Sequence, residues 1–319
     1  MNVSSTSTSD FLPPSQRFWL YFVFYVPSVP CSLFLLYEFI SDRTLRRSIN
    51  NHVIILILFT VLLCQATMYP WMFYYYQHSD MWERSYTFCA IWAFIDWSLY
   101  VLQLLLFSWA SIERHILIFH DKWVSTKRRR FWIHFFPLIA IPTYWFVIYS
   151  YIYFYPSCPN NFDPTVMLCV AACLYDDAVI RGLETFLHNT LPNIVIIVFS
   201  FGLLVRVTWK KYRVHQAMRW RKSRKMTVQL MSISGMYLIV TAPWGLTNFL
   251  RLCGWWSKSV TDLDNYVFFI SYYIVFLFPF VALTSLPNLR TRLKRMVPKL
   301  RIRRTIGPLP RAKARDNQT

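Results

Sequence analysis

Seven long apolar runs alternate with short polar segments along the chain. They cover residues 18–40, 53–76, 86–119, 131–155, 185–205, 227–250 and 266–289. Each is long enough to cross the hydrocarbon core of a membrane as a helix, which takes about 20 residues. Strands of a membrane barrel are about half that length and alternate in polarity, so the pattern excludes a barrel. It predicts an all-α fold, a bundle of seven transmembrane helices.

Basic residues gather on every second connection between the runs. Segments 41–52, 120–130, 206–226 and 290–319 contain 28 of the 34 Lys and Arg residues, whereas the N-terminus and the other connections contain five. Because positively charged segments stay on the cytoplasmic side, we expect an extracellular N-terminus and a cytoplasmic C-terminus. We also expect the basic segments to attract anionic lipids of the inner leaflet.

The pattern divides the chain into three parts. Residues 1–17 form an extracellular N-terminus, residues 18–289 the seven-transmembrane bundle and residues 290–319 a basic cytoplasmic tail. The N-terminus contains a glycosylation acceptor pattern at Asn2. After the seventh run, apolar residues recur every three or four positions among Arg and Lys, which predicts a short amphipathic helix along the membrane.

The composition is typical of a membrane protein and argues against several other classes of protein. Hydrophobic residues make up 55% of the chain and charged residues only 15%, too few to cover the core of a soluble protein of this length. The net charge of +19 falls in short blocks between apolar runs, so we expect no binding to nucleic acid. The sequence contains no hydrolytic or phosphate-binding motif, and we expect neither an enzyme nor a cofactor.

Four cysteines fall on the predicted outer side, Cys89 at the start of the third run and Cys158, Cys169 and Cys173 in the loop after the fourth. Because the outside of a cell is oxidising, we expect two disulfides. Four cysteines allow three pairings, and the residues alone do not choose among them. A zinc site is the alternative, but the loop contains no histidine, and we expect no metal.

Several spacings resemble those of rhodopsin-like (class A) G-protein-coupled receptors. Cys89 and Arg114 are 25 residues apart, as are the third-span cysteine and the arginine of the Asp/Glu-Arg-Tyr motif in that family. Here the motif reads Glu113-Arg114-His115. Prolines fall near the family's positions in the fifth, sixth and seventh spans, where kinks are expected: Pro192, Pro243 and Pro279.

The resemblance implies a plasma-membrane receptor that binds an extracellular small molecule or peptide and activates a cytoplasmic heterotrimeric G protein. It also implies a disulfide between the third span and the second outer loop, which favours Cys89–Cys173 and leaves Cys158–Cys169 within the loop. Some family residues are replaced, among them the tryptophan of the sixth span by Thr241. The chain therefore resembles a divergent member.

Glu113 and Arg114 lie near the cytoplasmic end of the third run. One interpretation is that Arg114 reaches toward the inner headgroups while its aliphatic stem stays in the membrane. The other, implied by the resemblance, is a switch: Arg114 pairs with Glu113 at rest and is released to meet the G protein. The foot of the sixth run contains only basic charges, so we expect little besides Glu113 to restrain Arg114.

Asp96 lies seven residues after Cys89, two helical turns further into the membrane. An acid within a transmembrane helix is a candidate functional site. The resemblance implies that it pairs with a cationic ligand group, with Tyr100 and Tyr272 as further ligand-binding candidates. A polar tie between helices is the alternative, with Asp96 hydrogen-bonded to Tyr272. Eight other acids, Glu184 among them, fall on the predicted outer side, where we expect an ordinary solvated surface.

A membrane channel or transporter is the alternative function. That class predicts repeats within the chain, helices broken at glycine, or ion sites at the middle of the membrane. The chain contains six Gly residues and one central acid, Asp96, and we find no repeat. The receptor function is therefore favoured.

Overall fold

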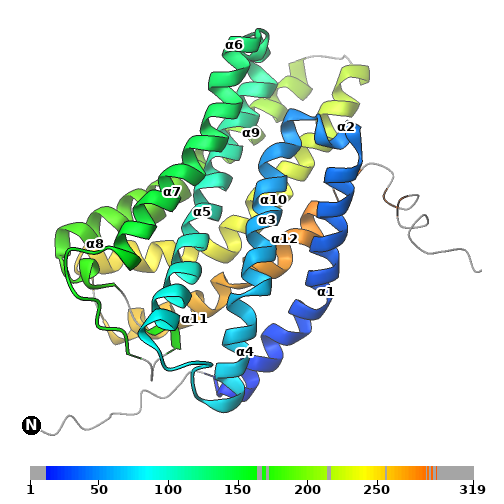
Figure 1. Ribbon diagram of the computed structural model, residues 1–319. Coiled ribbons are helices and arrows are strands. Elements are labelled where there is room, and N and C mark those ends of the chain that lie inside the picture. Colours follow the sequence, from blue (N-terminus) through cyan, green and yellow to red (C-terminus); the bar gives the residue numbers. More distant parts are fainter. Residues whose placement is uncertain are drawn as a thin grey trace, which may run out of the picture. The chain divides into compact units, whose positions relative to one another are not determined.

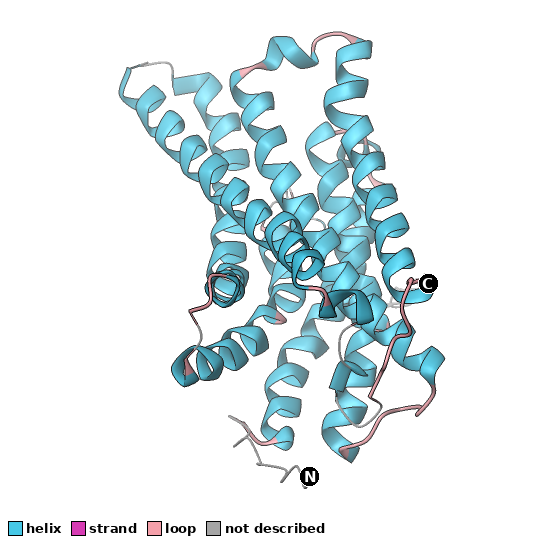
Figure 2. Cartoon of the chain, turned by 90° about the vertical axis from the view of Figure 1, so that its left-hand side faces the viewer, coloured by secondary structure: helices cyan, strands magenta, loops and turns pink. Residues whose placement is uncertain are grey.

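The computed structural model describes residues 12–163, 167–169, 172–213, 217–255, 257–284, 286, 289 and 292. The chain divides into two units, Met1–Ser285 and Leu286–Thr319. Asn2 and, except for Arg292, the predicted basic tail with its amphipathic helix lie outside the described residues. Among the described residues there are helices and connections but no strand, as Figure 2 shows, so the predicted all-α fold is confirmed.

Among the described residues of the first unit, helices lie at the positions of all seven predicted runs (Figure 1). Three spans are single helices, and they are α1 (Pro14–Ser41), α5 (Tyr86–Phe119) and α10 (Ala217–Leu252). The second span consists of α3 (Ile49–Ala66) and α4 (Met68–His78), and the seventh of α11 (Lys258–Ser271) and α12 (Tyr273–Leu283). The fourth span consists of α6 (Lys127–Arg130), the π-helical segment η2 (Phe131–Phe135) and α7 (Phe136–Phe154). The fifth consists of α8 (Ala178–Glu184), the π-helical segment η5 (Thr185–Thr190) and α9 (Leu191–Arg213).

Length and composition support the transmembrane assignment. Five described helical segments are long and apolar enough to cross a membrane, and the bent pair in the seventh span makes a sixth. The helix α10 contains the remaining predicted run, residues 227–250. Large apolar side chains are exposed on the outside of the bundle, including Trp19 at 61%, Phe201 at 65% and Ile239 at 76%. Such a surface suits lipid better than water.

The central helix of the bundle is α5, which packs against α3, α7, α9 and α10. The helix α1 packs against α3 and α12 on the other side. Polar side chains tie these helices together, since Ser28 donates to the carbonyl of Phe276 at 3.0 Å and Gln65 donates to the Ser28 hydroxyl at 2.8 Å. Because lipid does not drive helices together, such bonds and close packing stabilise the bundle.

The two ends of the bundle differ in chemistry. We call the end with Cys89 and the loop 156–177 the disulfide end, and the end with α2 (Arg43–Arg46), η1 (Asp121–Val124) and α6 the basic end. In Figure 1, α2 and α6 lie at the upper end of the bundle and α4 and α11 at the lower end. Both candidate sites lie on α5, one toward each end.

The disulfides differ from the pairing expected from the family resemblance. Cys89 pairs with Cys169, and Cys158 pairs with Cys173, so the expected Cys89–Cys173 and Cys158–Cys169 are wrong. The loop turns at Leu168 and Cys169, whose φ angles are 69° and 54°, and this turn brings Cys169 against α5, where it is fully buried. Distance along the chain does not reveal such a left-handed turn.

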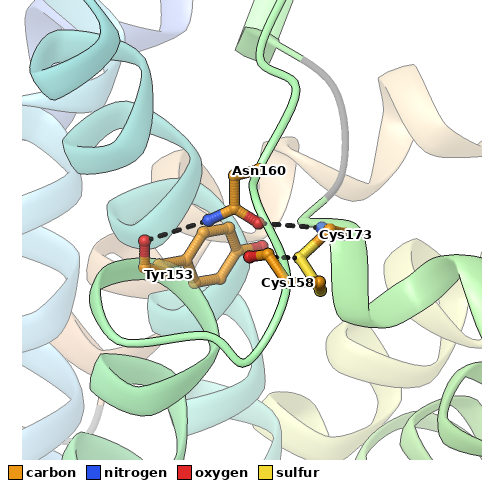
Figure 3. Close-up of a disulfide and its surroundings, with 4 residues drawn as sticks. All are labelled: Tyr153, Cys158, Asn160 and Cys173. Atoms are coloured by element: carbon orange, nitrogen blue, oxygen red, sulfur yellow. Dashed lines mark hydrogen bonds between the residues drawn. A yellow bond between two sulfur atoms is a disulfide. The ribbon is translucent and has the colours of Figure 1, made fainter.

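An asparagine positions the second disulfide (Figure 3). The side-chain nitrogen of Asn160 donates to the carbonyl of Tyr153 at 3.2 Å, and its side-chain oxygen accepts from the backbone N–H of Cys173 at 2.8 Å. Asn160 thus joins the end of α7 to the start of η4 (Cys173–Asp176). Cys158 therefore lies beside Cys173 and pairs with it. Cys169 pairs with Cys89.

The seventh span bends at Tyr272, seven residues before Pro279, where the kink was expected. Helices α11 and α12 meet there at 41°, and Pro279 lies inside α12. The carbonyl of Tyr272 accepts a hydrogen bond from the Tyr69 hydroxyl at 2.7 Å, and a side chain that inserts into the helical bond ladder is a common cause of bending. The span also begins earlier than predicted, at Lys258, because Ser257 caps α11.

Pro192 and Pro243 have different surroundings. Pro192 is the second residue of α9, which begins directly after η5. A proline lacks the N–H that an α-helix requires, and the chain accommodates it with wider π-type bonds, such as that from the Leu191 N–H to the Phe186 carbonyl. Pro243 lies inside the single helix α10.

The disulfide pairing can be checked by protease digestion of the purified, non-reduced protein and mass spectrometry. We expect one linked peptide pair with Cys89 and Cys169 and another with Cys158 and Cys173, because the turn at Leu168 separates the alternatives. Reduction before digestion is the control and should release all four peptides. A linked pair containing Cys89 and Cys173 would contradict the assignment.

Candidate functional site

Three neighbouring residues of α5 contact three different parts of the bundle near the basic end. In an α-helix successive side chains point about 100° apart, so Glu113, Arg114 and His115 face different neighbours. Glu113 and Arg114 are buried, at 1% and 4% exposure. Each of the three has its own set of contacts.

Glu113 is held by a histidine from the fourth span. The Nδ1 of His134, in η2, hydrogen-bonds to Oε1 of Glu113. The Nε2 of His134 lies 2.7 Å from Nδ1 of His52, in α3, and the Nε2 of His52 lies 2.8 Å from the carbonyl oxygen of Arg46, in α2. We call this series the Glu113 chain: Glu113, His134, His52 and the carbonyl of Arg46. It joins α5, η2, α3 and α2.

The π-helical segment brings His134 into the bundle. A π-helical turn contains one more residue than an α-helical turn and so rotates the residues that follow. His134 is fully buried, while its neighbours Trp132, Phe135 and Phe136 are 55%, 39% and 45% exposed. The aromatic side chains face outward and the imidazole faces Glu113.

Arg114 lies on another face of α5, next to the sixth and seventh spans. It lines a cavity of about 20 Å³ together with Ile57, Ser234 and Phe278, which has room for about one water molecule. Ser234 belongs to α10 and Phe278 to α12. At 4% exposure, Arg114 is out of reach of a protein partner in this conformation.

His115 connects α5 to the fifth span. Its Nε2 accepts a hydrogen bond of 2.9 Å from the guanidinium of Arg206, in α9, and its ring lies against Phe119 and Phe199. The expectation that Glu113 alone restrains this region is incomplete. Glu113 is bound to His134, and Arg114 and His115 contact separate helices.

Asp96, Tyr100 and Tyr272 line a single cavity nearer the disulfide end. The hydroxyl of Tyr272 donates to both carboxylate oxygens of Asp96, at 3.0 and 3.1 Å. The cavity has a volume of about 30 Å³, enough for about two water molecules. Its walls include Trp97 and, from α10, Trp244. Thus the structure brings the three ligand candidates together.

Aromatic rings close this cavity. The ring of Trp244 lies 4.9 Å from that of Tyr100 and 5.6 Å from that of Trp97, both nearly perpendicular to it. Phe268 contacts Trp244 at 5.2 Å and Tyr272 at 5.1 Å. The two edge-to-face contacts that Trp244 makes with Tyr100 and Trp97 stabilise the packing of α10 on α5 by about 0.5–1.5 kcal/mol each.

Comparison with protein-family models assigns the chain to a family. Residues 32–281 match the model described as the 7 transmembrane receptor (rhodopsin family), which covers most of the bundle, including both cavities on α5. This protein is a rhodopsin-family receptor. Comparison with curated proteins gave no match. The receptor class agrees with the resemblance carried by Cys89, Glu113 and Arg114, and membership implies a multi-pass membrane protein of a generally non-enzymatic family.

The receptor contains a second buried acid that the sequence interpretation missed. Glu184 was counted with the solvated outer acids, but it is only 8% exposed. Its Oε1 accepts from Nε1 of Trp97 at 3.0 Å and from the hydroxyl of Tyr149, and its Oε2 lies 2.5 Å from Nδ1 of His188. The four-residue spacing of Glu184 and His188 is the sequence signal that could have indicated this pair.

Glu184 therefore links three spans of the receptor next to the Asp96 cavity. Trp97 belongs to α5, Tyr149 to α7 and Glu184 to α8. The network extends to α7 once more, because the Tyr144 hydroxyl lies 2.7 Å from Nε2 of His188. Since Trp97 also lines the cavity, the network fixes one of its walls.

A close approach of the fifth and sixth spans lies directly after Trp244. A Cβ atom on Gly245 would lie 2.7 Å from the side-chain oxygen of Asn189 and 2.8 Å from the side-chain nitrogen of Asn193. These distances are shorter than carbon contacts allow, so glycine lets α10 sit against η5 and α9 at this position.

Removing the charge of Glu184 should destabilise the receptor. We expect Glu184→Gln to lower the free energy of unfolding by about 2–4 kcal/mol, because an amide cannot accept from all three of its donors and leaves buried polar groups unsatisfied. The measurement is thermal unfolding of the purified receptor in detergent. Glu83→Gln is the matched control, since Glu83 is exposed, and it should change stability by at most about 0.5 kcal/mol. Equal effects of the two variants would contradict the network.

Proposed function

We propose that this receptor lies in the plasma membrane with its disulfide end outside, binds a cationic amine at Asp96, and activates a heterotrimeric G protein at its basic end. The observation that carries the proposal is the setting of Asp96. Its carboxylate faces a cavity walled by aromatic rings. Within the part of the chain that the structure describes, the Tyr272 hydroxyl is its one hydrogen-bond donor.

An ammonium group would complete the hydrogen bonding of Asp96. A carboxylate has about four acceptor positions, and an ammonium group offers three donors and the opposite charge. The faces of Trp97, Tyr100 and Trp244 would attract the same cation. The competing role, a tie between the third and seventh spans, accounts for the Tyr272 bond but not for the cavity. The amine could belong to a small molecule or to a peptide.

Binding requires the cavity to open. A volume of about 30 Å³ is too small for an amine ligand, and the rings of Tyr100 and Trp244 lie 4.9 Å apart. We propose that an amine entering beside Asp96 separates these two rings and, because Trp244 belongs to α10, moves α10 away from α5.

The helix α10 also lines the cavity at Arg114. Ile233 and Ser234 of α10 line the Arg114 cavity, and Trp244 follows Ile233 by eleven residues, about 16 Å along the helix. A displacement of α10 at Trp244 that extends along the helix would uncover Arg114 at the basic end, where a G-protein segment could contact it. The ligand would then act by favouring the displaced position of α10.

A channel or transporter is less well supported. The cavities at Asp96 and Arg114 have volumes of about 30 and 20 Å³. Each has room for only one or two water molecules, so neither holds an ion with its water shell. The acid and the arginine that would mark an ion path are instead bound or covered by neighbouring helices.

The proposal is tested with cells that carry the receptor, a panel of amines with their uncharged analogues, and a sensor for each class of G protein. We expect at least one amine, and not its uncharged analogue, to activate a sensor. Asp96→Asn should lower the potency of that amine by about 30-fold or more, because losing one partner of a buried ion pair costs at least about 2 kcal/mol.

Two further variants separate ligand binding from G-protein activation. Arg114→Gln should keep amine binding and lose the sensor response. Asp80→Asn is the matched control at the disulfide end, because Asp80 is a partly exposed acid that pairs with Arg84 at 2.8 Å, and it should leave potency unchanged. An amine equally potent on Asp96→Asn contradicts the ligand assignment, and a response that survives Arg114→Gln contradicts the role of Arg114.

A further inference from the structure

A further cavity lies at the basic end of the bundle, where η1 meets the start of the fourth span. Its volume is about 560 Å³, and its lining consists of Trp123, Arg128, Arg129, Trp132 and Ile133. The two tryptophans are 52% and 55% exposed, so the cavity is open at the surface. Unlike the small cavities at Asp96 and Arg114, it has the size of a ligand site without any movement of a helix.

Two elements build this cavity. Arg128 and Arg129 belong to α6, and Trp132 and Ile133 follow them by four residues in η2, about one helical turn further along the same face. Trp123 comes from η1. Each tryptophan has its own support, because the ring of Trp123 stacks on His120 at 4.9 Å and that of Trp132 contacts Phe136 at 5.0 Å. The aromatic part of the lining is therefore held in place.

The two arginines make the cavity strongly positive. The residues that line it include no acid, and among the described residues neither guanidinium is hydrogen-bonded or ion-paired to another side chain. The surrounding segment 120–130 contains five basic residues and one acid, Asp121. Guanidinium groups bind phosphate oxygens through pairs of N–H donors. The cavity thus has the charge and the donors for a phosphate.

The surface beside the cavity favours a phosphate that belongs to a lipid. Tryptophan and arginine side chains together are typical of the boundary between headgroups and hydrocarbon. Trp132 contacts Phe136 of α7, and Phe136 and Ile139 are 45% and 61% exposed. A phosphate bound by Arg128 and Arg129 therefore has an apolar surface next to it, on which acyl chains can pack.

The charge and size of the cavity narrow the choice of headgroup. The phosphodiester of an ordinary phospholipid has one negative charge, whereas a phosphate monoester has a charge of about −1.5 to −2 and three acceptor oxygens. Two neighbouring guanidinium groups match the monoester better. A volume of about 560 Å³ is also far larger than one phosphate needs, and it leaves room for the ring of an inositol headgroup beside the tryptophans.

We propose that this cavity binds an inner-leaflet phospholipid whose inositol headgroup carries a phosphate monoester. The guanidinium groups of Arg128 and Arg129 bind the monoester, the tryptophan rings flank the inositol, and the acyl chains pack along α7 at Phe136. The inference goes beyond the amine and G-protein assignments. It uses the proposed orientation only to name the leaflet, and binding by the purified receptor does not depend on that orientation.

The test counts lipids on the purified full-length receptor by native mass spectrometry, without amine or G protein. The receptor in detergent micelles is titrated with phosphatidylinositol 4-phosphate, phosphatidylinositol or phosphatidylserine. We expect the first to bind about tenfold more tightly than the other two, because it alone carries a phosphate monoester. Equal affinity for the three lipids overturns the choice of headgroup.

A matched pair of double variants separates the cavity from the rest of the basic end. Arg128→Gln/Arg129→Gln should weaken binding of phosphatidylinositol 4-phosphate about tenfold or more, because both phosphate-binding groups are lost. Arg43→Gln/Arg47→Gln removes the same charge from exposed positions in and after α2, and it should change the affinity less than about twofold. Equal losses in the two double variants show diffuse attraction to a basic surface and overturn the site.

The aromatic part of the site is tested with the charge unchanged. Trp123→Ala should weaken binding about threefold or more, because it removes one ring from the lining. Trp19→Ala is the control, since Trp19 is 61% exposed on α1 and lies outside the cavity, and it should leave the affinity unchanged. Unchanged binding by Trp123→Ala places the lipid outside the cavity and contradicts the proposal.

Two further comparisons exclude other occupants. Inositol 1,4-bisphosphate has the same phosphates without acyl chains, and we expect it to displace less than half of the bound lipid at equal concentration. Complete displacement makes the ligand a soluble phosphate and overturns the lipid assignment. The other comparison uses G-protein activation in cells. If Arg128→Gln/Arg129→Gln loses activation but binds phosphatidylinositol 4-phosphate as the wild type does, the surface belongs to the G protein and the proposal is wrong.

Discussion

Glu113 carries a carboxylate that is 1% exposed among apolar side chains, where an ionised group without hydrogen-bond donors is too costly to persist. His134 supplies the donor, His52 supports His134, and the carbonyl of Arg46 completes the series. This requirement draws together α5, η2, α3 and α2. Arg114, the next residue of α5, borders a cavity that residues of α3, α10 and α12 also line.

A similar requirement operates toward the disulfide end. Asp96 is bonded to Tyr272 beside a cavity, and Glu184 is bonded to Trp97, Tyr149 and His188. In both places α5 carries an acid that needs partners, and α10 lines a cavity, with Trp244 toward the disulfide end and Ser234 toward the basic end. The second, third and fourth spans are thus tied by buried bonds, whereas aromatic packing joins α10 to α5. The polar bonds of α10 run instead to α11, through Thr247 and Arg251 to Asp264.

Hydropathy and spacing predicted the helical class, the location of most spans and the receptor family, because these depend on averages over many residues. The third run matched α5 at both ends. Side-chain partners were not predictable in the same way. In the sequence, His134 is a single polar residue in an apolar run, and only the π-helical segment η2 turns it toward Glu113. Glu184 was likewise taken for an acid of a loop. The disulfide pairing depended on the backbone turn at Leu168 and Cys169, which spacing cannot express.

A double-mutant cycle on Glu113 and His134 tests most directly whether their bond holds the basic end together. Glu113→Ala and His134→Ala are made singly and together in the full-length receptor, and the free energy of unfolding is measured for each. We expect each single variant to lose about 3–5 kcal/mol, and the double variant to lose about 1.5–3 kcal/mol less than the sum. The same cycle on Glu113 and the exposed His78 should be additive. Additivity of Glu113 and His134 would contradict the account.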